Sequence, residues 1–243
     1  MAKIKVLSTK KLEPSLIRKA EEQGIDVVEQ EAIQIKPILN RETADRIISL
    51  ALDNKRTIVL TSSNAVNALE KYMSYGGNFC LIDWQVFCLS GKTKDTLLSA
   101  RRLEKQILGE APNATELAHE IIRQNVSEVV FFCGNRRRDE LPDMLQAAGI
   151  TVHEVVVYEV EETPVAAAGD YEAVLFFSPS AVQSFFAANQ LKENTVCFAI
   201  GQTTANSVKQ FTQSKPVVSK EPTQEALLME VINYFKNEVN DQH

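Results

Sequence analysis

The sequence predicts an α/β protein with two similar doubly wound parallel-sheet domains joined by a two-stranded β linker. Three observations support this prediction. Short β-branched and aromatic runs alternate with amphipathic segments along nearly the whole chain. About ten strands would make an unusually wide single sheet, whereas two sheets of about five strands are of ordinary size. The second half also resembles the first at nearly constant offsets, which indicates an internal duplication.

The expected strands are short apolar runs, typical of strands that are covered on both faces. They lie at 3–8, 25–29, 57–61, 85–89, 105–108, 128–133, 151–158, 172–177, 195–200 and 216–218. The expected helices carry apolar residues at helical spacing, and the first has Pro14 near its start and Gly24 as its stop. They lie at 13–23, 41–53, 64–74, 93–101, 114–124, 138–148, 180–190, 203–212 and 223–237. Such regular alternation predicts parallel strands connected by crossover helices.

The duplication is permuted, because its segments match at different offsets. The segment that starts at Gly91 matches the one that starts at Gly201, and 62–66 matches 178–182. The N-terminal segment 16–29 instead matches 141–154, so the unit that opens one domain closes the other. An insertion within 75–84 accounts for the change in offset. Chance similarity among α/β repeats is the alternative explanation.

The permutation predicts a discontinuous domain of residues 1–34 and 163–243, with a second α/β domain, residues 40–155, inserted into it. The hinge strands 35–39 and 156–162 would connect the two domains. The two crossings are rich in β-forming residues and lead towards Pro37 and Pro164, so we expect them to lie side by side. A ligand held between two domains near a hinge is a common arrangement.

Composition excludes several classes of function. The net charge of −6 argues against a general nucleic-acid binder, although clusters such as Arg136, Arg137 and Arg138 leave room for an anionic small molecule. The four cysteines form no C-x-x-C pair and the three histidines are scattered, so we expect no metal site. Without a signal peptide or an apolar stretch that could span a membrane, we expect a cytoplasmic protein.

Loops that follow the strands of a parallel sheet are the expected ligand-binding positions. Six such loops, three in each expected domain, consist mainly of hydroxyl, glycine, asparagine and basic residues, which let a carboxylate approach backbone N–H groups at helix N-termini. Helix capping favours the same residues and is the alternative explanation for each loop. The candidate binding residues are Thr9, Lys10, Thr61, Ser62, Ser63, Asn64, Gly91, Lys92, Thr93, Gly134, Asn135, Arg138, Ser178, Pro179, Ser180, Gly201, Thr203 and Thr204.

The loops lack the glycine-rich nucleotide motifs, and their nearest carboxylate is Asp139. The absence of an obvious acid–base pair indicates that the site positions its ligand and makes little use of strong acid–base chemistry.

Several motifs resemble those of the uroporphyrinogen-III synthase family. In order, they are T-S-S-N-A-V (61–66), G-K-T (91–93), C-G-N-x-x-R (133–138), V-V-V-Y (155–158), F-F-S-P-S-A-V (176–182) and A-I-G-Q-T-T-A (199–205). Asn64 departs from the family pattern, since many relatives carry a basic residue there. The resemblance covers residues 60–205, and the predicted split-domain topology covers the remainder.

The resemblance implies a dehydrating cyclisation without a cofactor. Hydroxymethylbilane loses its terminal hydroxyl as water, and attack at the substituted carbon of ring D gives a spiro intermediate that recloses as uroporphyrinogen III with ring D inverted. Tyr158 is the candidate catalytic residue, as a hydrogen-bond partner of the leaving hydroxyl; ordinary strand packing is its alternative role.

The implied partners are the linear tetrapyrrole and, in a transient hand-off, hydroxymethylbilane synthase. No nucleic acid or membrane is implied, and we expect a monomer. The competing hypothesis is a non-catalytic two-lobed binding protein or sensor for an anionic metabolite.

Overall fold

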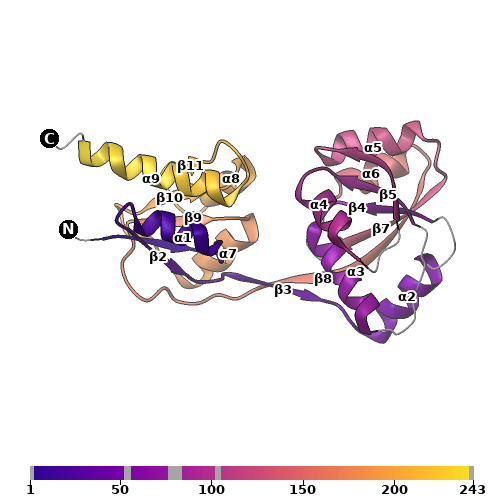
Figure 1. Cartoon of the computed structure of the whole chain (residues 1–243), viewed down its shortest axis with the longest axis horizontal. Coiled ribbons are helices and arrows are strands. Elements are labelled where there is room, and N and C mark those ends of the chain that lie inside the picture. Colours follow the sequence, from indigo (N-terminus) through magenta and orange to yellow (C-terminus); the bar gives the residue numbers. More distant parts are fainter. Residues whose placement is uncertain (1–2, 52–55, 76–83, 102–104, 241–243) are drawn as a thin grey trace. The chain divides into compact units, whose positions relative to one another are not determined.

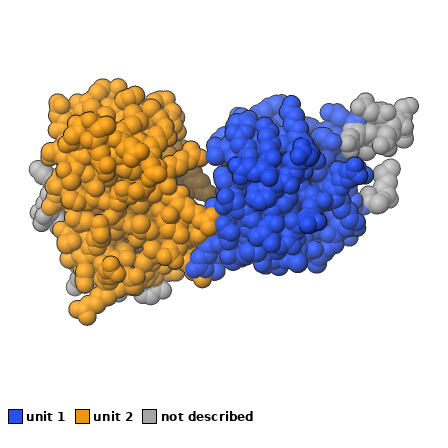
Figure 2. Space-filling model, turned by 180° about the vertical axis from the view of Figure 1, so that it is seen from behind, with its two compact units in different colours: residues 1–34, 161–243 blue, residues 35–160 orange. Residues whose placement is uncertain are grey.

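The computed structural model describes residues 3–51, 56–75, 84–101 and 105–240. The chain divides into two compact units, which Figure 2 shows in different colours. Unit 1 contains Met1–Gln34 and Glu161–His243, and unit 2 contains Ile35–Val160. The predicted insertion within 75–84 lies almost entirely outside the described residues. Whether either unit folds independently stays a prediction.

Unit 1 is a five-stranded parallel sheet with the order β11-β10-β9-β1-β2 (Figure 1). Residues of α1 and α9, such as Leu16 and Leu227, form a buried cluster with Val6 on one face of the sheet. Residues of α7 and α8 cover the other face, where Leu7 points. The strands are β1 (Ile4–Ser8), β2 (Ile25–Glu29), β9 (Ala173–Phe176), β10 (Val196–Ala199) and β11 (Val217–Val218), and the helices are α1 (Pro14–Glu21), α7 (Pro179–Ala188), α8 (Gln202–Val208) and α9 (Gln224–Asn240).

Unit 2 is built around a six-stranded sheet with the order β3-β8-β7-β4-β5-β6. Helices α2, α3 and α4 contribute to the core on one face, and α5 and α6 contribute to the core on the other. The strands are β3 (Ile33–Pro37), β4 (Thr57–Leu60), β5 (Trp84–Leu89), β6 (Lys105–Ala111), β7 (Glu128–Gly134) and β8 (Thr151–Glu162), and the helices are α2 (Arg41–Ala51), α3 (Ser63–Tyr75), α4 (Lys92–Ser99), α5 (Ala114–Arg123) and α6 (Glu140–Ala147).

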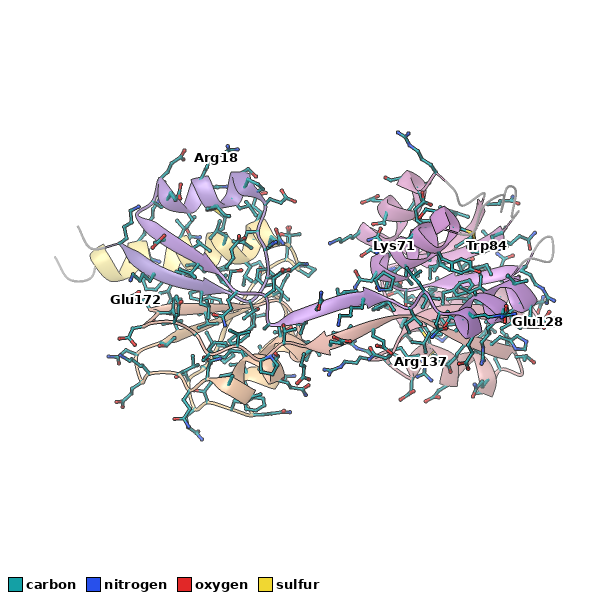
Figure 3. The ribbon with its side chains drawn as sticks, turned by 90° about the horizontal axis from the view of Figure 1, so that it is seen from below. Arg18, Lys71, Trp84, Glu128, Arg137 and Glu172 are labelled. Atoms are coloured by element: carbon teal, nitrogen blue, oxygen red, sulfur yellow. The ribbon has the colours of Figure 1, made fainter. Side chains whose placement is uncertain are left out.

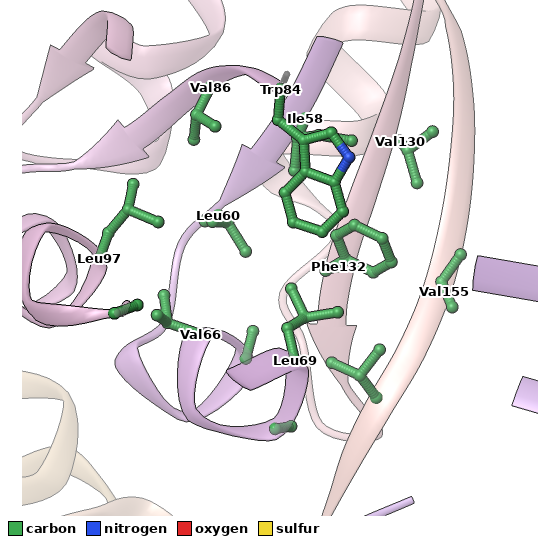
Figure 4. Packing of buried hydrophobic residues seen from close by; sticks show 14 of the residues in the cluster. Ile58, Leu60, Val66, Leu69, Trp84, Val86, Leu97, Val130, Phe132 and Val155 are labelled. Atoms are coloured by element: carbon green, nitrogen blue, oxygen red, sulfur yellow. The ribbon is translucent and has the colours of Figure 1, made fainter. Parts of the chain in front are cut away.

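Large apolar side chains fill the core beneath α3 and α4 (Figure 4). The rings of Trp84 and Phe132 are fully buried, with their centroids 5.6 Å apart. Burying an aromatic side chain of this size stabilises a fold by about 1.5–3 kcal/mol. The strands that carry these residues are therefore held firmly, which fixes the loops at their carboxyl ends.

The strands β3 and β8 are neighbours, which confirms the predicted two-stranded β linker. The N–H of Ile38 donates to the carbonyl of Val157 at 2.9 Å, and the N–H of Thr163 donates to the carbonyl of Ala32 at 3.0 Å. Residue numbers rise along one strand as they fall along the other, so the two strands are antiparallel. β8 is a single strand that first pairs with β7 and then continues into the linker.

The sheet orders are those that a permuted duplication predicts. Unit 2 without β3 reads β6-β5-β4-β7-β8, and unit 1 reads β11-β10-β9-β1-β2. The offsets predicted from the sequence match β4 with β9, α4 with α8 and α6 with α1. The direction in which successive strands are added to the sheet therefore changes between β4 and β7 in unit 2, and between β9 and β1 in unit 1.

Some element ends differ from the prediction. The strand expected at 105–108 continues to Ala111, because its pairing with β5 shifts register between Val86 and Phe87 and then resumes. The helix expected at 138–148 begins at Glu140, since a turn that joins the N–H of Arg137 to the carbonyl of Gly134 precedes it.

Candidate functional site

Because the strands of the unit 2 sheet are parallel here, three of the expected loops lie together at the carboxyl ends of the strands. These loops follow β4, β5 and β7, and those after β4 and β7 flank the point where the strand order reverses. Ligands of open α/β sheets bind outside the carboxyl ends of the strands at such a point. The loops after β9 and β1 occupy the equivalent edge of the unit 1 sheet.

The loop after β4 caps helix α3. The Oγ atom of Ser62 accepts a hydrogen bond from the N–H of Asn64 at 3.1 Å, and its carbonyl accepts one from the N–H of Ala65 at 3.1 Å. Thr61, Ser63 and Asn64 are half-buried beside it. Capping is therefore a role that Ser62 fulfils here, as the preference of serine for this position suggests.

The phenol of Tyr158 also contacts Ser62. Its hydroxyl donates to Ser62 Oγ at 3.1 Å, although the two residues are far apart in the sequence. The ring is partly buried against the core beneath α3 and α4. The candidate catalytic phenol therefore lies at the point where the strand order of unit 2 reverses, beside the loop after β4.

The loop after β7 holds β8 in place. The N–H of Asn135 donates to the carbonyl of Tyr158 at 3.2 Å, and Asn135 Oδ1 accepts from the N–H of Val160 at 2.9 Å. Gly134 lies opposite Tyr158 in the strand register. Both residues were expected to bind substrate, and the structure shows both of them in contact with β8.

Within the arginine cluster, Arg137, which Figure 3 labels, forms ion pairs with acidic side chains. Its Nη2 donates to Glu154 Oε1 at 2.8 Å, and a second ion pair joins it to Asp139. These two carboxylates raise the pKa of the Arg137 guanidinium above its usual range. Arg138, the predicted binding residue, is exposed.

The loops before α4 and α8 begin their helices with glycine and without a side-chain cap. Gly91 and Gly201 are the N-caps of the two helices. N–H groups in the first turn of an uncapped helix are donors for an anion. Thr93 and Thr204 are buried, whereas Lys92 and Thr203 are exposed.

The loop after β9 repeats the arrangement of the loop after β4. Ser178 is the N-cap of α7, and its Oγ accepts from the N–H of Ala181 at 3.1 Å. Pro179 follows at the first position of the helix, where it lacks an N–H. Ser180 is half-buried beside them.

The loop after β1 brings together Thr9 and Lys10. The Thr9 hydroxyl is buried and donates to the carbonyl of Leu175 at 2.8 Å. Lys10 is exposed, with its Nζ 6.0 Å from the centroid of the Phe177 ring. Phe177 stands in the motif F-F-S-P-S-A-V and was not among the predicted site residues; an aromatic residue directly after a buried strand was the available signal.

The described cysteines belong to the core. Burial raises the pKa of Cys88 and of Cys133 to about 11, and that of Cys197 to about 12. Thiolates are therefore scarce at neutral pH at these three positions, which disfavours nucleophilic chemistry there. Cys80 lies outside the described residues. In the described parts of the chain, no cluster of three or more His, Cys, Asp or Glu side chains could hold a metal ion.

The helices of the described ranges are all too short or too polar to cross a membrane.

Solved structures of known proteins share the fold. A uroporphyrinogen-III synthetase from Helicobacter pylori matches with a TM-score of 0.70 and 17% identity, covering 95% of this chain and 99% of the other. A mutant uroporphyrinogen III synthase from the extremely thermophilic bacterium Thermus thermophilus matches with a TM-score of 0.66 and 14% identity, covering 97% and 99%. No curated protein matches the chain significantly.

The sequence model of the family described as Uroporphyrinogen-III synthase HemD matches residues 14–229, which is most of the chain. This match confirms the resemblance that the ordered motifs indicate. The chain belongs to the uroporphyrinogen-III synthase family.

Proposed function

We propose that the chain closes hydroxymethylbilane to uroporphyrinogen III with inversion of ring D, a step of tetrapyrrole biosynthesis. The family match over residues 14–229 carries this proposal. An enzyme that catalyses this reaction is a lyase, because a C–O bond breaks, water leaves and a ring closes.

Water loss is the step in which Tyr158 would take part. Its phenol would donate a proton to the leaving hydroxyl as the C–O bond breaks, while the pyrrole nitrogen supplies the electron pair that forms the azafulvene. The pyrrole N–H proton would then restore the phenol, so that the step releases one neutral water. A phenol is a weaker acid than a carboxyl group or an imidazolium, so we expect modest assistance.

Isomer choice requires that the bilane be held in a folded shape. The bilane is a polycarboxylate, and we propose that it binds through first-turn N–H groups of helices such as α4 and α8. The absence of side-chain caps at Gly91 and Gly201 supports this role. Orientation of this kind can supply a large part of a rate enhancement without strong acid–base chemistry.

We place the reaction in the cytoplasm and expect a monomer that receives the bilane from hydroxymethylbilane synthase. Three buried free thiols suit a reducing compartment.

Enzyme and carrier differ in stoichiometry. The purified protein, at a concentration well below that of freshly made hydroxymethylbilane, should convert many equivalents to the type III isomer of uroporphyrinogen. A carrier would bind at most about one equivalent and leave the remainder to close spontaneously. Type III product that never exceeds about one equivalent of the protein would favour the two-lobed binding protein.

A further inference from the structure

The structure assigns Gly134 and Asn135 to holding Tyr158; this differs from their predicted role in binding substrate. We infer that they are positioning residues, which fix the phenol beside Ser62 and act on the reaction only through it. The inference rests on the proposed function of the chain and on the proposed role of Tyr158. It makes a different prediction for substrate affinity than direct binding would.

The first observation is an irregularity in β8. The register with β7 shifts between Cys133 and Gly134: Cys133 pairs with Val156, and Gly134 pairs with Tyr158. Side chains of a regular strand alternate between its faces, and a β-bulge interrupts this alternation and re-aims a side chain. Val157 is buried in the core beneath α3 and α4, and Tyr158, the next residue, packs against the same core. The irregularity thus turns the phenol towards the loop after β4.

The second observation is steric. A Cβ atom at Gly134 would lie 2.5 Å from Cε2 and 2.8 Å from the hydroxyl oxygen of the Tyr158 ring. The φ of Gly134 lies outside the left-handed region, so glycine is not needed there for its backbone freedom. It is needed because the ring lies directly over its Cα, and any larger residue would displace the phenol.

The third observation is the pair of hydrogen bonds between Asn135 and β8. They reach the carbonyl of Tyr158 and the N–H of Val160, so they hold β8 on both sides of Glu159. The bond at Val160 uses only the side-chain oxygen. An aspartate can supply the same acceptor, whereas an alanine cannot.

Asn135→Asp and Asn135→Ala separate positioning from substrate binding. If Asn135 positions Tyr158, Asn135→Asp keeps kcat and KM within about twofold of the wild type. Asn135→Ala then lowers kcat by roughly 10-fold, since a small misplacement of a reacting group is costly, with little change in KM. If Asn135 binds a substrate carboxylate, Asn135→Asp is the worse variant and raises KM through repulsion. That result, or a wild-type kcat in Asn135→Ala, would overturn the inference.

Gly134→Ala tests the steric contact. We expect a lower kcat in the wild-type background and no further loss in a Tyr158→Phe background, where the hydroxyl to be placed is already absent. Gly109→Ala is the matched control, since a Cβ there would crowd Phe87 in the same sheet, away from Tyr158. Gly109→Ala should lower the free energy of unfolding. Any effect that it has on kcat should be the same in the wild-type and Tyr158→Phe backgrounds, so that the two losses add. Additive losses for Gly134→Ala as well would contradict the inference.

A spectroscopic measurement keeps the inference separate from the proposed function. The NMR signal of Tyr158 in protein labelled at the tyrosine Cζ carbons is identified by its absence in Tyr158→Phe. It should shift in Gly134→Ala and Asn135→Ala and stay in place in Asn135→Asp and Gly109→Ala. If the signals follow this pattern but the wild type does not turn over the bilane, the proposed function is wrong and the inference stands. If the wild type is active but the Tyr158 signal does not shift in Gly134→Ala and Asn135→Ala, the inference is wrong and the proposed function stands.

Discussion

The hydroxyls of Tyr158 and Ser62 are within hydrogen-bonding distance at the point where the strand order of unit 2 reverses. Replacing Tyr158 by phenylalanine removes the proton donor and keeps the ring over Gly134. We expect a kcat lowered by roughly 10-fold to 100-fold, at or below the lower end of the roughly 100-fold to 10,000-fold that general acid catalysis supplies. Type III should stay the product, because water loss precedes the choice of the attacking carbon.

The control is Tyr171→Phe, since the Tyr171 hydroxyl donates to the carbonyl of Ala168 in unit 1 and has no proposed role. Rates and isomer ratios of both variants are measured by chromatography of the oxidised porphyrins. A folded Tyr158→Phe protein that binds the bilane without any turnover above background would make Tyr158 an essential acid, against the positioning account.

Gly201 offers a clean probe of backbone access. Its φ of −174° is extended backbone that any residue adopts, and a Cβ built there meets no atom beyond its chain neighbours within 4 Å. If first-turn N–H groups of α8 bind a carboxylate, the valine side chain of Gly201→Val should keep the carboxylate from approaching them. We expect KM to rise by about 10-fold, which corresponds to the loss of one good hydrogen bond to a charged group. Gly91 is a poorer probe, because its φ of +69° adds strain to any substitution.

Thr203→Ala and Ser178→Ala provide the comparison. Each should change KM by less than about threefold, although Ser178→Ala also removes the cap of α7, which costs about 1 kcal/mol of stability. Steady-state kinetics of the three variants decides the matter: equal increases in KM would mean that side chains, and not the backbone, carry the binding.

At the scale of elements, equivalent glycines end equivalent helices. Gly24 follows α1 with a φ of +75°, and Gly149 follows α6 with a φ of +81°. Alanine in this left-handed conformation costs roughly 1–2 kcal/mol. Gly24→Ala and Gly149→Ala should therefore each lower the free energy of unfolding by this amount, as measured by urea denaturation. Gly201→Ala, with extended backbone and open space, should change it by less than about 0.5 kcal/mol, the size of an ordinary surface effect. A similar loss at all three positions would argue against the backbone as the cause.

Most elements were predictable from the sequence because their signals are local. Apolar runs such as Val129–Cys133 mark buried strands, and Pro14 with Gly24 bounds the first helix. The orientation of Tyr158 was not predictable, since it depends on a register shift between β7 and β8 that only tertiary pairing reveals. The role of Asn135 was hidden for the same reason: its partners lie on a strand far along the chain.

Capping and binding could not be separated by sequence either. Serine, threonine and glycine suit both roles, and the structure shows capping at Ser62 and Ser178 but no side-chain cap at Gly91 or Gly201. The distinction depends on which N–H groups already have partners, a property of the folded backbone.

At the scale of the whole molecule, the permuted duplication leads us to propose that each unit folds by itself. Both sheets have their own cores, and the chain passes between the units only in β3 and β8. A fragment of residues 35–160 keeps the pairing of β8 with β7 and should unfold cooperatively in urea, with a native-like circular dichroism spectrum. The control is a fragment of residues 1–126, which separates β1 and β2 from β9 and should not fold cooperatively. An unfolded 35–160 fragment beside a well-folded 1–126 fragment would contradict the division.

We propose that this protein sets the isomer formed from hydroxymethylbilane. Without an enzyme, the bilane closes to the type I isomer. The most direct test is the ratio of type III to type I uroporphyrinogen formed by catalytic amounts of the purified protein, corrected for spontaneous closure in a matched blank. We expect type III to predominate and to increase with protein concentration. Type I alone, formed at the rate of the blank, would contradict it.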